Sequence, residues 1–337
     1  MITDFIQKLV ERENLSGEEA RSVMEEIMTG QATDVQIAGF LTALRMKGET
    51  AEELIAFAKV MQERAEPFWD EEVLPVLDTC GTGGDGSGSF NISTAAAFVA
   101  AGAGIRVAKH GNRSATSRCG SADVMEALGT DIEMPIGRLR QSIRDAGIGF
   151  LFARRFHSSM KHVAAARTQL KIRTVFNILG PLASPARARY QVVGVFSPHL
   201  MELMAKALHG LNVAHAFVVH GADGMDEISI AGKTHVTEMK AGELKTYTIS
   251  PEDFGIAQAD LTTLAGGDAA ANARIIESVL RGEQGPRRNV VLLNAAAAIV
   301  SGGAAASLSE GIRAAADSID TGAAFRRLEL LREYSAI

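Results

Sequence analysis

Cysteine is scarce in this sequence of 337 residues, which holds only Cys80 and Cys119. Two cysteines do not make the disulfide framework on which small secreted domains depend. Long apolar runs are also missing, because the longest, 95–104 and 295–300, fall short of the roughly 20 residues that a membrane-spanning helix needs. Residues 1–8 show no basic stretch followed by an apolar core, so no signal peptide is visible. We therefore expect a cytoplasmic protein with no membrane partner.

Aromatic residues and histidines are few, and neither sign of charge dominates. Aromatic residues make up 5% of the chain, and the eight histidines are scattered, so no cluster of His and Cys with metal-ligand spacing is visible. The net charge of −6 argues against a general nucleic-acid coat protein. Residues 137–189 carry eleven Lys or Arg against one acid, Asp145, but no interleaved aromatic platform. This segment is typical of solvated helix surface that also attracts anionic substrates, and we expect no nucleic-acid partner.

The chain is long enough for about two domains, and its 47% hydrophobic residues supply a large core. The first 64 residues predict a small helical bundle, because apolar positions recur at helical spacing. Three capping boxes stand there in succession: Ser16 with Glu19, Thr33 with Gln36, and Thr50 with Glu53. Residues 66–72 break the helical pattern and look like a linker.

From Val73 onward, short β-rich runs alternate with Ala-rich helical stretches, which predicts an α/β domain with a mainly parallel central sheet. The strand candidates are 73–77, 105–108, 191–196 and 217–220. Residues 228–249 predict a small antiparallel patch with Gly232 and Gly242 at its turns, and 290–300 fit either a strand or a buried helix. The predicted fold class is α/β, with a large α/β domain and a small all-helical domain.

A glycine-rich loop follows the first strand candidate and precedes an Ala-rich helix. Five glycines fall within positions 81–88. The N–H groups of such a loop can converge on an anion, and the helix that opens near Asn91 adds a partial positive charge. Asp85 would repel phosphate, so it suits a metal or a sugar hydroxyl. The loop predicts a phosphate site, with an ordinary glycine-rich turn as the alternative.

Two common phosphate motifs fit this loop poorly. Gly81, Gly83 and Gly86 match G-x-G-x-x-G, but the helix does not begin within the motif. The second strand candidate is followed by Lys109 and His110, where a dinucleotide-binding fold would place an acid. No Gly-Lys-Ser/Thr closes the loop, which excludes a P-loop.

Two further polar segments follow later strand candidates. Residues 109–118 place cations, hydroxyls and a glycine at the end of a strand, where ligands of open α/β sheets bind. A solvated basic loop is the alternative reading of that segment. Residues 220–227 hold the adjacent carboxylates Asp226 and Glu227, which suit Mg²⁺ shared with substrate phosphates. A plain turn is the alternative there.

Four motifs in this order resemble those of the anthranilate phosphoribosyltransferase family, and the resemblance covers nearly the whole chain. The motifs are 81–85 with 91–94, 109–117 with 120–123, 174–182 and 220–227. The family shares its fold with pyrimidine nucleoside phosphorylases. The resemblance implies a small helical domain, 1–70 with a returning part near 165–190, hinged to an α/β phosphoribosyl-binding domain of 71–164 and 191–337. It also implies a homodimer joined through the helical parts.

The reaction that the resemblance implies moves the phosphoribosyl group of PRPP (5-phosphoribosyl 1-diphosphate) to the amine of anthranilate, in tryptophan biosynthesis, with two Mg²⁺ ions. The implied metal ligands are Ser93, Asp226 and Glu227. The implied anthranilate-binding residues are Gly81, Asn112 and Arg167. The implied PRPP-binding residues are Gly81, Gly84, Asp85, Ser89, Asn91, Ile92, Ser93, Thr94, Lys109, His110, Gly111, Asn112, Arg113, Ser114, Ala115, Thr116, Ser117 and Ser121. No catalytic base is identified, and Lys109 and His110 are expected to give electrostatic help.

The sequence departs from the family pattern at a few positions. Ser89 stands where Thr is usual, Arg118 and Cys119 replace a more usual Lys-Ser, and Ser184 stands where Asn is common. None of these changes removes an implied ligand.

Two other functions stay open at this point. A pyrimidine nucleoside phosphorylase of the same fold also binds phosphate with a glycine-rich loop, but its metal-free phosphorolysis does not need the acidic pair. A non-catalytic relative that binds nucleic acid is disfavoured by the net charge.

Overall fold

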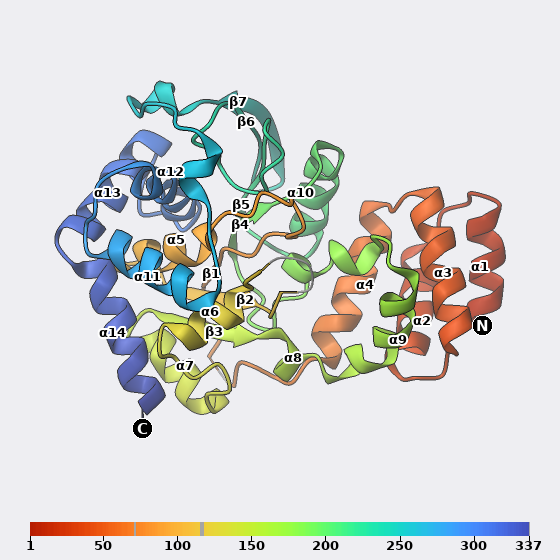
Figure 1. Ribbon diagram of the computed structural model, residues 1–337. Helices are drawn as coiled ribbons and strands as arrows, with labels where there is room; N and C mark the ends of the chain where they lie inside the picture. The colour runs from red at the N-terminus through yellow and green to blue at the C-terminus, as the bar shows by residue number, and fades with distance from the viewer. Residues whose placement is uncertain (71, 115–117, 337) are drawn as a thin grey trace.

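The computed structural model describes residues 1–70, 72–114 and 118–336. A helical bundle at one end of the molecule stands beside a larger α/β part, with the N-terminus in the first and the C-terminus in the second (Figure 1). The bundle begins with α1 (Ile2–Val10), α2 (Gly17–Met28), α3 (Asp34–Lys47) and α4 (Ala51–Arg64). All three predicted capping boxes are confirmed at the starts of α2, α3 and α4. Local capping chemistry therefore fixes where these helices begin.

A later helix completes the bundle. After the short helix α8 (Ala153–Phe156), α9 (Lys161–Leu170) returns to pack against α2 and α3. The core that these helices enclose includes Val163 and Ala166 of α9, and Val175 and Phe176 beyond it. Two segments about 100 residues apart in the chain thus share one core.

The α/β part is built on a seven-stranded sheet with the order β3-β2-β1-β4-β5-β6-β7. The strands are β1 (Leu77–Asp78), β2 (Val107–Gly111), β3 (Ile148–Phe152), β4 (Tyr190–Gly194), β5 (His215–Gly221), β6 (Thr234–Lys240) and β7 (Glu243–Ile249). The first five of these run parallel to one another, and β6 and β7 are antiparallel. The parallel strands are almost wholly buried, as expected for strands with both faces covered. The predicted fold class is confirmed.

Helices surround the sheet (Figure 1). They are α5 (Ile92–Gly102), α6 (Ser121–Ala127), α7 (Ile136–Asp145), α10 (Met201–Gly210), α11 (Ala269–Leu280), α12 (Pro286–Ser301), α13 (Leu308–Asp320) and α14 (Ala323–Ala336). The undecided segment 290–300 lies inside α12, which is buried along most of its length. In the described part of the chain, no helix is both long and apolar enough to cross a membrane.

Alternate residues of the central strands enter two different cores. Val192 of β4 and Phe217 of β5 pack into the core that contains α5 and α12. Val193 of β4 and Val218 of β5 face the other way, into the core that contains α10 and the bundle helices. This is the two-residue period of a strand. The helical bundle therefore shares its hydrophobic core with one face of the sheet.

Three details differ from the sequence-based prediction. The expected strand 73–77 is only Leu77–Asp78, because the chain reaches the gap between β2 and β4 at residue 77, whereas Val73 is 61% exposed. The antiparallel patch is not separate, since β6 pairs with β5 and so extends the main sheet. Ala241 and Gly242, both with positive φ, form the turn between β6 and β7. The strand β3 was not among the candidates.

The segment predicted to be a linker is anchored to the α/β part. Phe68 is buried, and the indole N–H of Trp69 donates to the carbonyl of Ala186 at 2.8 Å. Asp70 forms an ion pair with Arg140 at 2.8 Å. The chain thus passes from the bundle to the sheet along a fixed path.

The buried carboxylate Glu53 is expected to be a main determinant of bundle stability. It accepts from the backbone N–H groups of Leu15 and Thr50 and pairs with Lys47 at 2.9 Å, and both charged side chains are almost fully buried. Glu53→Ala leaves the buried ammonium of Lys47 with the neutral carboxamide of Asn14 but without its carboxylate, so it should lower the free energy of unfolding by about 3 kcal/mol or more. Chemical denaturation measures this loss. Glu18→Ala, at an exposed position of α2, is the control and should cost less than about 1 kcal/mol.

Candidate functional site

The glycine-rich loop, residues 81–89, joins β1 to the N-terminus of α5. Gly83, Gly84, Gly86 and Gly88 all have φ between 66° and 78°, a conformation that residues with a Cβ rarely adopt. Thr82 fixes the loop to the neighbouring strand, because its N–H donates to the carbonyl of Gly194 at 2.8 Å. Sequential glycines in this conformation direct N–H groups toward a common point, as an anion site requires.

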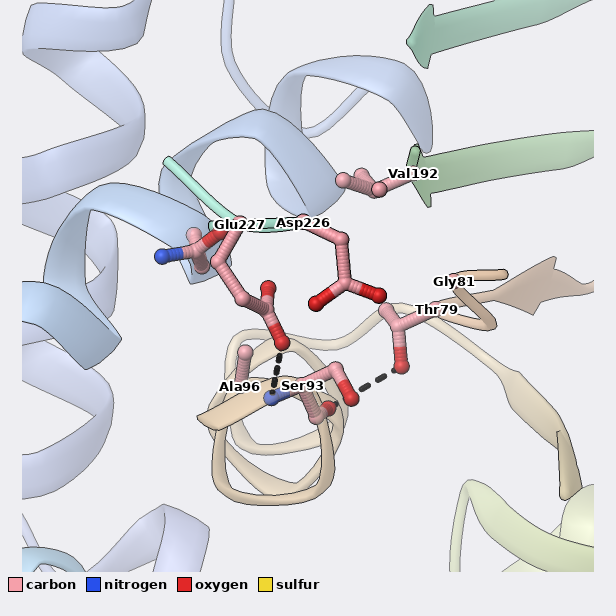
Figure 2. A pocket seen from close by; sticks show the side chains of 9 residues that line it. Thr79, Gly81, Ser93, Ala96, Val192, Asp226 and Glu227 are labelled. Atoms are coloured by element: carbon pink, nitrogen blue, oxygen red, sulfur yellow. Dashed lines mark hydrogen bonds between the residues drawn. The ribbon is translucent and has the colours of Figure 1, made fainter. Parts of the chain in front are cut away.

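Two adjacent carboxylates reach this loop from the segment after β5. Asp226 accepts from the N–H of Gly83 at 2.8 Å, and Glu227 accepts from the N–H of Ser93 at 3.1 Å. Ser93 lies in the first turn of α5, so Glu227 meets the positive end of that helix. Figure 2 shows both side chains pointing into one hollow, opposite Thr79 and Ser93. Residues 143 positions apart in sequence are therefore neighbours.

The carboxylates of this site repel one another. Burial raises the pKa of Asp226, and the nearby charge of Asp85 raises it further. Burial and the charge of Asp226 raise the pKa of Glu227, while Lys109 lowers it. Oδ2 of Asp85 is buried and has no hydrogen-bond partner among the described residues. Three clustered carboxylates, two of which have raised pKa values, have the donor chemistry of a divalent-cation site.

Lys109 lies beneath the loop and is only 3% exposed. Its Nζ donates to the carbonyl of Thr79 at 2.6 Å and contacts the hydroxyls of Thr79 and Ser93 at 3.2 and 3.3 Å. A buried, fully directed ammonium at this place adds a fixed positive charge next to the acids.

The other predicted residues of the loop and of α5 have mixed surroundings. The carboxamide of Asn91 contacts the carbonyl of Cys119 and accepts from Asn272 at 2.9 Å. Ser89 forms an isolated bridge with Ala265. Ile92 is 1% exposed and belongs to the hydrophobic core, so only its backbone can meet a ligand. The hydroxyl of Thr94 is buried without a partner among the described residues.

The second polar segment begins at Gly111 and continues beyond β2. Arg113 is held by Asp123 at 2.8 Å and by Glu126 at 2.5 Å, so its charge is already paired. Ser121 starts α6, and its hydroxyl contacts the carbonyl of Asn112 at 3.4 Å. Ser114 donates its N–H to Asp123. The predicted residues Ala115, Thr116 and Ser117 lie outside the described residues.

His110 lies on the opposite face of β2 from Lys109. Its Nδ1 contacts the carbonyl of Gly180 at 3.2 Å, and its ring meets that of His157 edge to face. Burial and the neighbouring imidazole lower the pKa of His110 to about 3. His110 is therefore a neutral imidazole, and the help expected from it would be a hydrogen bond and not a positive charge.

Arg167 belongs to α9 in the helical bundle. Its guanidinium lies 5.5 Å from the ring centre of Phe176, and burial lowers its pKa. Within the described residues no carboxylate forms an ion pair with it, and no hydrogen bond joins it to Gly81 or Asn112. The structure thus places this predicted residue on a different part of the molecule from the glycine-rich loop.

Sequence reasoning missed two residues that touch the site. Arg173, beyond α9, donates to the carbonyl of Gly84 and lies 4.0 Å over the ring of Phe196. Asp78, at the end of β1, is fully buried and accepts from the N–H of His110 at 3.0 Å. A carboxylate at the carboxyl end of a parallel strand was a signal for Asp78. No local signal marked Arg173, because its contact depends on the return of the chain from the bundle.

The acidic pair, Ser93 and the first residue of the glycine-rich loop line a small hollow that opens to solvent. Its lining consists of Thr79, Gly81, Ser93, Ala96, Val192, Gly194, Asp226, Glu227 and Asn294 (Figure 2). Backbone donors, a helix N-terminus and a buried lysine favour anions there, and the carboxylates favour a divalent cation. The arrangement suits a metal-bound polyphosphate.

Comparison with known proteins agrees with this geometry. Residues 74–325 match the family model described as the glycosyl transferase family, α/β domain, and residues 3–65 match that of the same family's helical bundle domain. The chain is 54% identical to the anthranilate phosphoribosyltransferase of Anaeromyxobacter dehalogenans over 98% of both chains. It is 52% identical to that of Symbiobacterium thermophilum, over 98% of this chain and 97% of the relative.

Solved structures of such enzymes superpose on nearly the whole molecule. The Thermus thermophilus enzyme has a TM-score of 0.93 at 44% identity, covering 98% of this chain and 99% of the other. The Saccharomyces cerevisiae enzyme in complex with PRPP and Mg has a TM-score of 0.90 at 32% identity, covering 99% and 98%. The chain therefore belongs to the glycosyl transferase family with these two domains and, within it, to the anthranilate phosphoribosyltransferases.

Proposed function

We propose that this protein transfers the 5-phosphoribosyl group of PRPP to the amine of anthranilate, giving N-(5-phosphoribosyl)anthranilate and pyrophosphate, as a step of tryptophan biosynthesis. The observation that carries the proposal is the convergence of the glycine-rich loop, the start of α5 and the acidic pair on one hollow. PRPP needs both an anion site and a metal site, and this hollow has the groups for both. The reaction class is pentosyl transfer.

Mg²⁺ fits the donor set, because Asp226, Glu227 and Asp85 are clustered acids whose pKa values are raised or whose oxygens lack a partner. The yeast relative was solved with PRPP and Mg. We assign Ser93 to one ion and Asp226 with Glu227 to a second. Bound Mg²⁺ would neutralise the leaving pyrophosphate.

The chain's own groups add to this stabilisation. Breaking the bond between C1 of the ribose and the pyrophosphate leaves an oxocarbenium-like sugar and a strongly charged leaving group. The N–H groups of the glycine-rich loop and the ammonium of Lys109 are fixed before the reaction, so they stabilise that charge without reorganising. The anthranilate amine is neutral, and its positioning next to C1 matters more than a strong base.

We assign the phosphoribosyl moiety to the segments that end at this edge of the sheet. The proposed PRPP contacts are the predicted ones: the loop 81–89, the start of α5, and 109–117 with Ser121. Ser93 and Arg113 differ in how freely their side chains could contact PRPP. Ser93 faces the hollow, whereas Arg113 is paired with Asp123 and Glu126 and would have to exchange a carboxylate for a phosphate.

Anthranilate carries a carboxylate, and Arg167 is the proposed partner, with Gly81 and Asn112 as further contacts. The guanidinium of Arg167 is partly desolvated and has no ion-pair partner among the described residues. A planar guanidinium binds both oxygens of a carboxylate at once. Since Arg167 belongs to the helical bundle and Gly81 to the α/β domain, this assignment places anthranilate between the two domains, which we propose are joined by a hinge.

Arg167→Ala should raise the KM for anthranilate about 30-fold or more, because one partner of a charge-assisted pair is removed. The KM for PRPP should change less than about threefold. Steady-state kinetics with each substrate varied in turn measures both values. Lys161→Ala, at the exposed start of the same helix, is the matched control. Equal increases in both KM values would contradict the assignment.

Mg²⁺ should stabilise the fold more strongly as pH rises. Acids with raised pKa values keep protons in the folded state that the unfolded chain has already lost. Their contribution to the free energy of unfolding therefore falls as the pH rises from the ordinary carboxyl range through the raised pKa values. Bound Mg²⁺ reverses that loss. The increase in Tm caused by Mg²⁺ should therefore be larger at about pH 8.5 than at about pH 6. The variant Asp226→Asn with Glu227→Gln should show no such difference, and an unchanged difference would exclude the pair as the ligands.

The homodimer and the cytoplasmic location are also proposals. Large apolar side chains are exposed on the helical bundle at Met1, Val10, Val35 and Met46. Val10 ends α1, while Val35 and Met46 lie in α3, and these two helices pack side by side. Such a surface supports dimerisation through the bundle. The location rests on the sequence features alone.

The test of the proposed function is the fluorescence of anthranilate in the presence of purified protein. Fluorescence should fall only when PRPP and Mg²⁺ are both present. A folded protein that causes no loss would overturn the proposal and direct attention to phosphorolysis of pyrimidine nucleosides, and then to salt-dependent nucleic-acid binding.

A further inference from the structure

Three potential metal ligands converge on the face of the sheet opposite Lys109. They are Asp78 at the end of β1, Cys80 two residues later and His110 of β2. Residues 78 and 80 share a face because side chains alternate along an extended chain. One ligand atom from each of the three lies within 4.8 Å of the others. Thr79 and Lys109 contact each other on the opposite face, where Ser93 lies.

Two of these ligands are buried with unused lone pairs. Oδ1 of Asp78 accepts from the backbone of His110, but Oδ2 has no partner among the described residues. Nδ1 of His110 contacts a carbonyl oxygen, which can only accept, so the proton is on Nδ1 and the lone pair on Nε2. Nε2 also has no partner among the described residues. The exposed fractions of Asp78 and His110 are 0% and 4%, which makes unused lone pairs costly there.

We propose that Asp78, Cys80 and His110 bind one borderline transition-metal ion, such as Zn²⁺ or Co²⁺, at a site separate from the acidic pair. The ligand set of sulfur, nitrogen and oxygen suits such ions, whereas Mg²⁺ prefers oxygen alone. The contact of His110 with Gly180 is the outer-shell hydrogen bond that metal-bound histidines usually make.

The geometry requires only a small contraction. Tetrahedral Zn²⁺ bonds of about 2.0–2.3 Å place ligand atoms roughly 3.3–3.8 Å apart, and the present separations are no larger than 4.8 Å, so none must shorten by more than about 1.5 Å. Rotation of the Cys80 side chain can shorten the two separations that involve its Sγ, because this atom makes only a weak contact of 3.7 Å with the carbonyl of Gly81. Binding converts the thiol to a thiolate and transfers its proton to the buffer. A water molecule completes the fourth position.

The site would link the base of the glycine-rich loop to β2. Cys80 immediately precedes Gly81, and the neighbouring residue Gly81 packs against Gly194 and Asp226. An ion at this place would hold the first residues of the loop. Its effect would be on the loop and not on the charge of the leaving pyrophosphate.

Cobalt titration of the reduced, metal-free protein tests this proposal. In excess Mg²⁺, Co²⁺ should produce a sulfur-to-cobalt charge-transfer band. Cys80→Ala should abolish the band and weaken Co²⁺ binding more than about tenfold, and Asp78→Asn should weaken binding while the band persists at saturation. Cys119→Ala, which removes the other cysteine, should change neither.

The acidic pair provides a second control. The variant Asp226→Asn with Glu227→Gln should keep the band, because its carboxylates are not ligands of this ion. The proposal would be overturned if the wild type showed no band, whether Co²⁺ then bound through oxygen only or did not bind. A bridging water would in that case be the partner of the two lone pairs. Survival of the band in Cys80→Ala would overturn the proposal equally. None of these readouts depends on transferase activity.

Discussion

Replacing Asp226 with Asn and Glu227 with Gln together is expected to lower kcat/KM by about three orders of magnitude. Both carboxylates face the hollow, and both have raised pKa values, first because of burial and then because the charges of Asp85 and Asp226 lie close by. The amides keep the shape of the side chains and can accept from Gly83 and Ser93, so the glycine-rich loop should stay in place. What disappears is the charge that we propose binds Mg²⁺.

Kinetics measured across a Mg²⁺ titration separates this explanation from a structural one. The variant should need a much higher Mg²⁺ concentration for half-maximal rate. Its Tm without Mg²⁺ should be no lower than that of the wild type. Asp223→Asn is the control, since Asp223 is exposed on the same segment and accepts from Met225 N–H at 3.1 Å. An unchanged Mg²⁺ profile in the double variant would mean that the pair is only part of a turn.

Gly194→Ala should inactivate the enzyme by displacing the acidic pair. A Cβ at Gly194 would lie 1.5 Å from the carbonyl oxygen of Asp226. The obstacle is backbone, so no change of side-chain conformation relieves it. The segment that carries Asp226 and Glu227 must move, and a displacement of about 1 Å at such a site is enough to lower kcat/KM about 100-fold.

The same substitution should also cost stability, by about 3 kcal/mol, because β4 lies in the middle of the sheet. Kinetics and chemical denaturation of the purified variant measure the two effects. Gly232→Ala provides a matched control: its Cβ would meet nothing within 4 Å, and its φ is not in the left-handed region. Near-normal kinetics in Gly194→Ala would show that the position of the acidic pair tolerates movement.

Local signals in the sequence predicted the parts of this structure that depend on local physics. Capping boxes located α2, α3 and α4 because a hydroxyl and its partner three residues later satisfy the same helix end. The glycine-rich loop and the acidic pair were also recognisable as separate segments. Their contacts were not, because the N–H groups of Gly83 and Ser93 meet carboxylates more than 130 residues away. The residue pattern suggested that the acidic pair shares Mg²⁺ with substrate phosphates, and the resemblance to a family assigned the pair and the glycine-rich loop to one site.

Other features depend on packing that no short segment reveals. Burial makes His110 neutral, and that burial comes from Gly180 and His157 on other parts of the chain. The strand 73–77 shortened to two residues because its neighbours in the sheet determine where pairing begins. The hydrophobic periodicity of 290–300 could not distinguish a strand from a helix, because a wholly buried helix lacks a polar face.

The bundle that shares one core between the first 64 residues and α9 also sets an order for synthesis. Val163 and Ala166 of α9 reach α2 and α3 only after about 100 further residues have left the ribosome. Synthesis proceeds at about 5–20 residues per second. For roughly 5–20 s, therefore, the apolar surface of α2 and α3 that α9 later covers stays exposed. The amino-terminal helices thus emerge first as an unfinished unit, and a chain stalled near residue 160 is expected to be a chaperone client.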